Sequence, residues 1–239
     1  MRPVKVVRGF SFLTSRRFQT PCDAQRILPE WRQGSIGLYG TWEQASHIVV
    51  GKLDGGKLVG KTDPPSYATE AVRKIYWCEG ELRIDAYIRG TPVPTNKYLW
   101  GSLQPECRPA QLPAGRSPYA GPVMRIWFLT IEGGYLRPIL EGGGVHFLTL
   151  RGRWPSNLSE DSEQYLARLL LTPYANSLNA EDYALHFFSS ASNACFILGR
   201  EDCKLEIRKL SLNPNSAIGN AACEYLRSQF AESCGKVTR

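Results

Sequence analysis

The chain has 239 residues, of which 43% are hydrophobic, and it carries a formal net charge of +7. No apolar run approaches the roughly 20 residues that span a bilayer, and the N-terminal residues lack the uninterrupted apolar core of a signal peptide. These features argue against a membrane protein and predict a cytoplasmic chain with a buried core, whose charge favours an anionic partner such as nucleic acid.

Positive charge is concentrated at the N-terminus, where residues 1–32 hold seven Lys or Arg against two acids. Hydrophobic alternation predicts strands at 2–13 and 35–42, with a short helix at 23–31. The basic residues are compatible with a solvated rim or with a phosphate-binding patch, because arginine forks match phosphate oxygens. In the second interpretation the phosphate-binding residues are Arg8, Arg16, Arg17, Arg26 and Arg32.

Glycine-centred turns between β-prone runs predict two hairpins. The first covers residues 47–61 around Asp54-Gly55-Gly56, and the second covers residues 74–89 around Glu79-Gly80. Glycine supplies the positive φ that tight turns need. His47 opens the first hairpin and is expected to be a surface residue.

Alternation is clearest in the second arm of the second hairpin, where one buried and one solvated face are predicted. The solvated face carries Arg83, Asp85, Tyr87 and Arg89. An RNA-binding sheet could use such a face for stacking and phosphate contact. The interpretation that we favour is a cross-strand ion pair with Asp85.

Residues 91–122 contain seven of the sixteen prolines, a density that favours extended chain. Aromatic and basic residues lie among them, whereas disordered linkers are usually poor in aromatics. We therefore expect a partly ordered arm or insertion over the sheet, with Lys97 and Trp100 as candidate nucleic-acid contacts. A plain linker is the alternative.

Three β-prone runs in residues 123–154, separated by Glu-Gly turns, predict an antiparallel meander at the centre of the sheet. Further on, helices are expected near 159–172, with Ser159 as N-cap, and from 213 to Gly235. A strand at 183–189 and a hairpin made by 194–198 and 204–210 are expected between them.

Hairpins therefore dominate, and two or three helices are appended. The sequence predicts a single α+β domain over residues 1–239, with a mainly antiparallel sheet and residues 91–122 as a proline-rich arm. A ferredoxin-like sheet with a long proline-rich insertion is one form that this domain could take.

The cysteines fit a reducing compartment, because their number is odd and no two have the C-x-x-C spacing typical of structural zinc sites. We expect reduced, mostly buried thiols and neither a metal site nor a cofactor. The seven are Cys22, Cys78, Cys107, Cys195, Cys203, Cys223 and Cys234.

Two histidines are the weak candidates for catalysis. His146 and His186 each precede a hydroxyl residue by three positions in an apolar run. Two-histidine phosphoesterases are similar in carrying strand-borne histidines, but their hydroxyl follows two residues later, which places both groups on one face of a strand. With a spacing of three, the histidine and the hydroxyl residue lie on opposite faces of a strand. We therefore favour the interpretation that His146 is a hydrogen-bonded core residue.

The leading functional prediction is a non-enzymatic nucleic-acid-binding protein, with RNA rather than DNA as partner. It would act beside other protein subunits in a larger ribonucleoprotein or defence-type effector complex, and not at a membrane. Its expected architecture is similar to that of ferredoxin-like RNA-binding subunits of CRISPR effector complexes, without a shared motif. The alternatives are a small hydrolase using His146 and His186, and a scaffold that docks a partner through the proline-rich arm.

Overall fold

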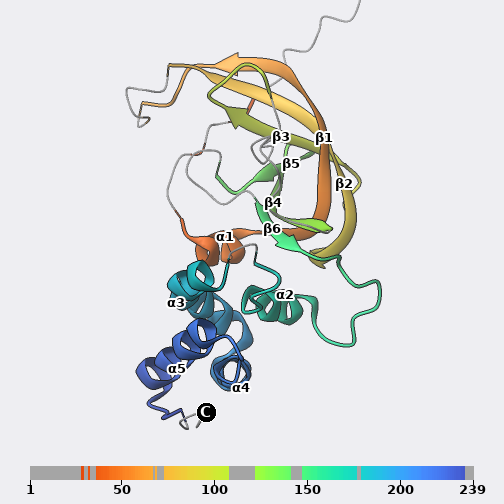
Figure 1. The fold of residues 1–239 in the computed structure, drawn as a ribbon. Coiled ribbons are helices and arrows are strands. Elements are labelled where there is room, and N and C mark those ends of the chain that lie inside the picture. Colours follow the sequence, from red (N-terminus) through yellow and green to blue (C-terminus); the bar gives the residue numbers. More distant parts are fainter. Residues whose placement is uncertain are drawn as a thin grey trace, which may run out of the picture.

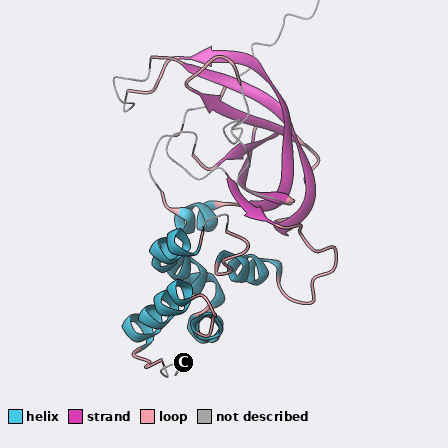
Figure 2. Cartoon of the chain, in the orientation of Figure 1, coloured by secondary structure: helices cyan, strands magenta, loops and turns pink. Residues whose placement is uncertain are grey.

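The computed structural model describes residues 28–29, 32, 36–66, 68, 73–107, 122–140, 147–176 and 179–234. Within them it contains five helices and a six-stranded, mainly antiparallel sheet, which confirms the α+β class. The strands gather in one half of the molecule and the helices in the other (Figure 2).

In chain order, the elements are α1 (Leu38–Gln44), β1 (His47–Thr62), β2 (Ile75–Arg89), β3 (Lys97–Ser102), β4 (Val123–Glu132), β5 (Tyr135–Pro138), β6 (Phe147–Arg151), α2 (Ser162–Leu170), α3 (Ala180–Leu198), α4 (Arg200–Ser211) and α5 (Ser216–Phe230). The long β1 and β2 curve together around one side of the sheet, and α1 and α2 lie at its lower end (Figure 1).

Five of the strands close into a ring. The strand order is β1-β2-β3-β5-β4-β6, and β1 pairs in addition with β4. Neighbouring strands are antiparallel except β3 and β5, which are parallel. A ring in which β1 pairs with both β2 and β4, and in which β3 runs parallel to β5, has the connectivity of an OB-fold. A ferredoxin-like sheet is not confirmed, because in the described part of the chain helices α2 to α5 follow the last strand and do not alternate with strands.

The ring interior is packed with side chains. Each ring strand contributes, and Trp127 donates a hydrogen bond from Nε1 to the carbonyl of Gly51 at 2.9 Å. Tyr98 and Trp100 stack with their ring centroids 5.4 Å apart. A ligand must therefore bind outside this filled interior or at its rim. The buried interior residues are Val49, Leu53, Cys78, Leu82, Tyr98, Trp100, Cys107, Trp127, Leu129 and Leu136.

The opposite face of β1, β2 and β4 packs against the helices. Alternate residues such as Ile48, Ile88 and Phe128 join one hydrophobic cluster with Leu166 of α2 and Phe187 of α3. The predicted period of two in β2 holds at Leu82, which is buried in the ring interior while Arg83 and Asp85 are exposed. The predicted single face is not continuous, because after the register shift opposite Val50 and Gly51 the residues Ala86 and Ile88 pack with the helices.

Both predicted hairpins in residues 47–89 are wrong, since β1 and β2 are each continuous. The two glycine-rich stretches lie opposite one another across the β1–β2 pair, at a register shift between Asp54 and Lys57. A Cβ on Gly80 would lie 2.9 Å from the carbonyl oxygen of Gly55. The glycines therefore serve close backbone approach at a bulge that bends two long strands, and not a chain reversal.

The β4–β5 hairpin is confirmed, with its turn at Gly133 and Gly134, which have φ of 58° and 79°. The meander order is wrong, because β6 pairs with β4 and not with β5. β4 has ten residues, so one edge of it holds β5 at Leu129–Glu132 and β6 at Val123–Trp127.

Four segments expected as strands belong to helices: 35–42 contributes to α1, 183–189 and 194–198 to α3, and 204–210 to α4. The buried residues of α3 recur at helical spacing, and Asn179 caps the helix by accepting from the backbone N–H of Asp182 at 2.8 Å. Gly199, with φ of 79°, separates α3 from α4. The residues between 198 and 204, which were interpreted as a hairpin turn, therefore mark the break between helices α3 and α4.

The helices predicted near 159–172 and from 213 are confirmed as α2 and α5, whereas the one predicted at 23–31 lies outside the described residues except for 28–29. Asp161 caps α2 in place of Ser159, accepting from the backbone N–H groups of Glu163 and Gln164 at 3.0 Å. Ala231, in a left-handed conformation, ends α5, and Gly235 lies outside the described residues.

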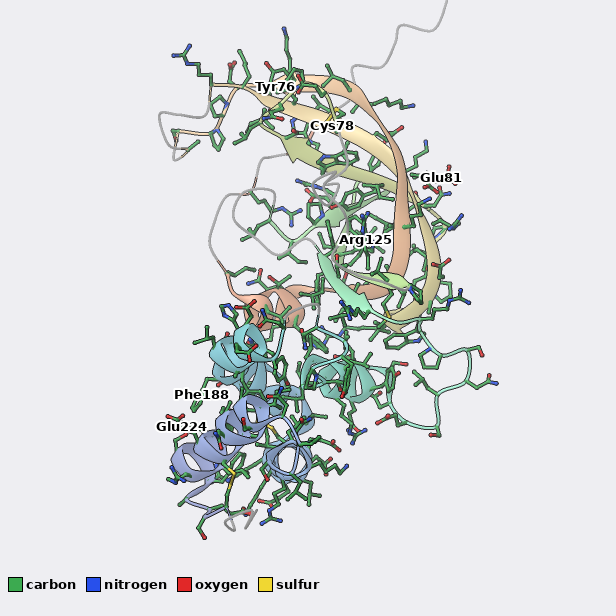
Figure 3. The ribbon with its side chains drawn as sticks, viewed as in Figure 1. Tyr76, Cys78, Glu81, Arg125, Phe188 and Glu224 are labelled. Atoms are coloured by element: carbon green, nitrogen blue, oxygen red, sulfur yellow. A yellow bond between two sulfur atoms is a disulfide. The ribbon has the colours of Figure 1, made fainter. Side chains whose placement is uncertain are left out.

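The expectation of reduced cysteines is wrong for the six that the structure describes. Disulfides join Cys78 to Cys107, Cys195 to Cys203 and Cys223 to Cys234, and Cys22 lies outside the described residues. Cys78 is on the sheet, and the other two bonds lie among the helices (Figure 3). Local spacing gave no signal because each bond depends on how separate elements pack.

The chain after α5 is held to α4 as well as to α5. Hydrogen bonds from Arg208 and Lys204 lower the pKa of Glu232 to about 2. Because the folded pKa lies below the ordinary carboxyl value, this contact contributes stability at neutral pH and loses it only in acid. Together with the Cys223–Cys234 bond, it fixes the end of the described chain.

Candidate nucleic-acid interface

A cleft of about 940 Å³ lies where two strands of the ring separate. The β1–β4 pairing ends at Val50 and Ile126, and beyond this point β1 continues along β2 while β4 pairs with β6. The chain between β6 and α2 forms the remaining wall. Its lining residues are Val50, Gly51, Lys52, Arg83, Asp85, Ala86, Tyr87, Val123, Met124, Arg125, Gly152, Arg153, Trp154, Pro155, Ser156, Leu158 and Ser162. This surface is the basic cleft.

Two cations of the basic cleft face each other across the β1–β2 pair. Lys52 and Arg83 are register partners, and the side chains of both are 62% exposed. Each has an acidic neighbour on its own strand, with Lys52 Nζ 3.1 Å from Asp54 and Arg83 Nε 3.8 Å from Asp85. Like charges directly opposite one another destabilise a sheet. A role in folding therefore does not explain why two cations occupy these opposite positions.

Two further cations reach the basic cleft from other elements. Arg125 on β4 is half-buried, with its guanidinium carbon 5.3 Å from the centroid of the Phe147 ring. Arg153 lies exposed just after β6. Within the part of the chain that the structure describes, neither arginine has a carboxylate partner. Arg125 is labelled on the sheet half in Figure 3. Both guanidinium groups are therefore available to an anion.

Aromatic rings accompany these charges. Trp154 is half-buried and meets Tyr165 of α2 edge-on, with ring centroids 5.2 Å apart. Tyr87 on β2 accepts a hydrogen bond at its hydroxyl from the backbone N–H of Val93 at 3.2 Å. Both rings are thus held in place by neighbours while they line the basic cleft.

The chemistry of this lining suits binding. It offers four cations, one carboxylate at Asp85, two serine hydroxyls and two aromatic rings. Neither histidine nor cysteine is among the described lining residues. Among the described residues, no group of three or more His, Cys, Asp or Glu side chains is placed to hold a metal ion.

Of the nucleic-acid-binding residues expected from the sequence, Arg83 is the one that lines the basic cleft. Asp85 pairs with Arg83 at 3.8 Å, but both residues are on β2, so the ion pair lies along one strand and not across two as predicted. Lys97 is exposed at the start of β3, opposite Glu81. Arg8, Arg16, Arg17 and Arg26 lie outside the described residues.

Three other expected contact residues are engaged within the fold. Arg89 donates to both carboxylate oxygens of Glu163 and to the carbonyls of Trp42 and Ala45, so it connects β2 with α1 and α2. Trp100 is only 7% exposed and belongs to the ring interior, where no base can stack on it. Arg32 pairs with Glu132, which also binds the buried Arg137 at 2.5 Å.

The proposed histidine pair is not assembled in the described structure. His186 lies exposed on helix α3 and not on a strand, and His146 lies outside the described residues. A helical His186 has no strand face to share with Ser189. His47 is at the start of β1, where its Nδ1 lies 3.0 Å from the hydroxyl of Ser46.

Sequence reasoning missed Lys52, Arg125, Arg153 and Trp154. The run Arg151-Gly152-Arg153-Trp154 carried a local signal, since two basic residues precede an aromatic one at the end of a strand. Lys52 and Arg125 carried no local signal, because their closeness in space depends on which strands pair and where that pairing ends.

No protein-family model matches the chain, and none of the curated proteins compared with it is significantly similar. Of the helices in the described part of the chain, none is both long and apolar enough to cross a membrane.

Proposed function

We propose that this protein binds single-stranded nucleic acid, RNA in preference to DNA, without catalysing a reaction, and that the basic cleft is its binding surface. The observation that supports this most is the convergence of Lys52, Arg83, Arg125 and Arg153 on one cleft beside Tyr87 and Trp154. Lysine and arginine neutralise phosphates, while aromatic faces stack on bases.

Size and shape favour a nucleic-acid strand over a small anion. The cleft volume of about 940 Å³ is near the upper end for drug-sized ligands, and its cations stand on separate walls. An unpaired strand presents successive phosphates and exposed base faces, whereas a duplex hides its base faces. OB-folds commonly bind oligonucleotides or oligosaccharides, which supports the proposal only as an analogy of fold.

Action within a larger ribonucleoprotein or defence-type complex remains part of the proposal. Exposed apolar side chains on the helical half suit contact with other subunits, including Leu185 at 78% and Phe196 at 65% exposed. The cytoplasmic location stays a prediction that the disulfides oppose, since such bonds persist mainly in oxidising compartments.

Neither alternative function is favoured by a specific observation. The hydrolase needs His146 and His186 on neighbouring strands, and His186 is on a helix surface. The scaffold was to dock through residues 91–122, but β3 lies inside this segment and forms part of the ring. Deleting residues 95–118 would remove that strand, so the deletion could not separate docking from folding.

Fluorescence anisotropy with labelled 12-nucleotide RNA, DNA and duplex probes tests the proposal. We expect the single-stranded probes to bind more tightly than the duplex, and RNA more tightly than DNA. For four phosphate contacts, the logarithm of the association constant should fall with that of salt concentration with a slope of about −3. Inorganic polyphosphate is the control for charge alone. Equal affinity for polyphosphate and RNA, or a slope near zero, would contradict the proposal.

A further inference from the structure

A second hollow, of about 460 Å³, adjoins the basic cleft. It lies between β2 and the chain that connects β2 to β3. Arg83 and Tyr87 line both this hollow and the basic cleft, so the two adjoin at these residues of β2. Its lining residues are Glu81, Leu82, Arg83, Ile84, Tyr87, Val93, Pro94, Thr95 and Asn96.

The lining of this hollow differs from that of the basic cleft. Its one cation, Arg83, is accompanied by one carboxylate, Glu81, so it has no excess of positive charge for a phosphate. Ile84, Val93 and Pro94 give it apolar walls, and Tyr87 adds an aromatic ring. A flat, uncharged group with polar edges suits these walls, and a nucleobase has that shape.

Hydrogen bonds fix the shape of the hollow. The backbone N–H of Val93 donates to the hydroxyl of Tyr87 at 3.2 Å, and the backbone N–H of Leu82 donates to the carbonyl of Asn96 at 2.8 Å. The side-chain amide of Asn96 donates to Oε1 of Glu81. Both walls are thus tied together, which reduces the ordering cost of binding.

Glu81 sets the chemistry at the rim. It lies exposed on β2, at the outer side of the curved β1–β2 pair in Figure 3. An ionised carboxylate only accepts hydrogen bonds, and glutamate accepts from the exocyclic amino group of cytosine. Uracil has no exocyclic amino group to donate.

We propose that this hollow takes an unpaired base of a strand whose phosphates lie in the basic cleft, and that Glu81 selects bases carrying an exocyclic amino group. This rests on the proposed function and narrows its ligand to single-stranded nucleic acid with cytosine, adenine or guanine, and not uracil, at the position that enters the hollow. Arg83 and Tyr87 stand at the border, where the strand passes from the phosphate contacts to the base contact.

The test compares the affinities of the full chain for oligo(C) and oligo(U) RNA of eight nucleotides. We expect wild type to prefer oligo(C) about tenfold, the effect of one hydrogen bond to a charged group. Glu81→Ala should bring this ratio close to one while the salt slope stays unchanged. The ratio is the informative quantity, because removal of a negative charge raises the affinity for both probes.

A second variant keeps the proposal testable if Glu81→Ala disturbs the Asn96 contact. Pro94→Trp fills the hollow from its exposed rim and removes no backbone donor, so it should also abolish the preference for oligo(C). Equal binding of both probes by wild type, with a steep salt slope, would overturn the base hollow and leave the proposed function intact. A preference that survives both variants would also overturn it, whereas absence of binding to every probe would overturn the proposed function itself.

Discussion

Replacing Arg125 and Arg153 together by glutamate is expected to lower the affinity for single-stranded RNA by about 100-fold, or ~2.7 kcal/mol. Both arginines line the basic cleft without a carboxylate partner among the described residues, so each is available to a phosphate. The exchange removes two contacts and places two negative charges beside the RNA. Anisotropy titrations should also show the salt slope become shallower by about 1.4 units.

A matched control separates local contact from net charge. Lys61, near the end of β1, and Arg227 on α5 are exposed cations outside the basic cleft. Their double replacement by glutamate changes the net charge equally, but screening should confine its effect to a few-fold. An equal loss of affinity in the control would show that the cleft is not the binding surface. Thermal unfolding of both variants verifies that the loss of the Arg125–Phe147 contact leaves the chain folded.

The second large effect concerns stability. Replacing Cys78 and Cys107 together by alanine should lower the free energy of unfolding by about 3.5 kcal/mol, the chain-entropy estimate for the 29-residue loop that this bond closes. The bond holds the chain after β3 against the β1 bulge, where a Cβ on Gly56 would lie 2.2 Å from the carbonyl oxygen of Cys107. Urea unfolding in the absence of reductant measures the loss.

Two controls accompany this experiment. With reductant present, wild type and the double variant should unfold at nearly the same urea concentration, because the bond is then absent from both. Thiol titration of the denatured, unreduced protein should find one free cysteine, since three bonds use six of the seven. Seven free thiols would contradict the disulfides and restore the sequence-based expectation of reduced cysteines.

Local pattern was sufficient where the element is decided by neighbours in the chain. The alternation from Glu81 to Asp85 in β2, the turn at Gly133 and Gly134, and the helices α2 and α5 could all be predicted. Each depends on side chains or dihedral angles within a few residues of one another.

Ring closure could not be predicted in this way. Gly55 and Gly80 look like turn residues in the sequence, but they oppose each other at a bulge, a fact that only the β1–β2 register reveals. The apolar run at Tyr183 suits a strand or a helix, and packing against Leu171 and the helical core decides for α3. Pairing between distant segments overrides local preference at both places.

The binding surface could be predicted only in part, for the same reason. Arg83 was identified from alternation, whereas Trp100 was mistaken for an exposed stacking residue because its burial requires a closed ring. Lys52 becomes informative only once the register places it opposite Arg83. Arg89 was assigned to the same solvated face, but the chain turns towards the helices there and Glu163 of α2 engages it.

The most direct test of the basic cleft is photo-crosslinking of the intact protein to 4-thiouridine-containing RNA, followed by mass spectrometry of the attached peptides. We predict crosslinks in the peptides that contain Tyr87 and Trp154, the aromatic residues of the cleft. An excess of unlabelled single-stranded RNA should compete them away. Crosslinks confined to α3, α4 and α5, or the same yield with the Arg125→Glu, Arg153→Glu double variant, would contradict the assignment of the basic cleft as the nucleic-acid-binding surface.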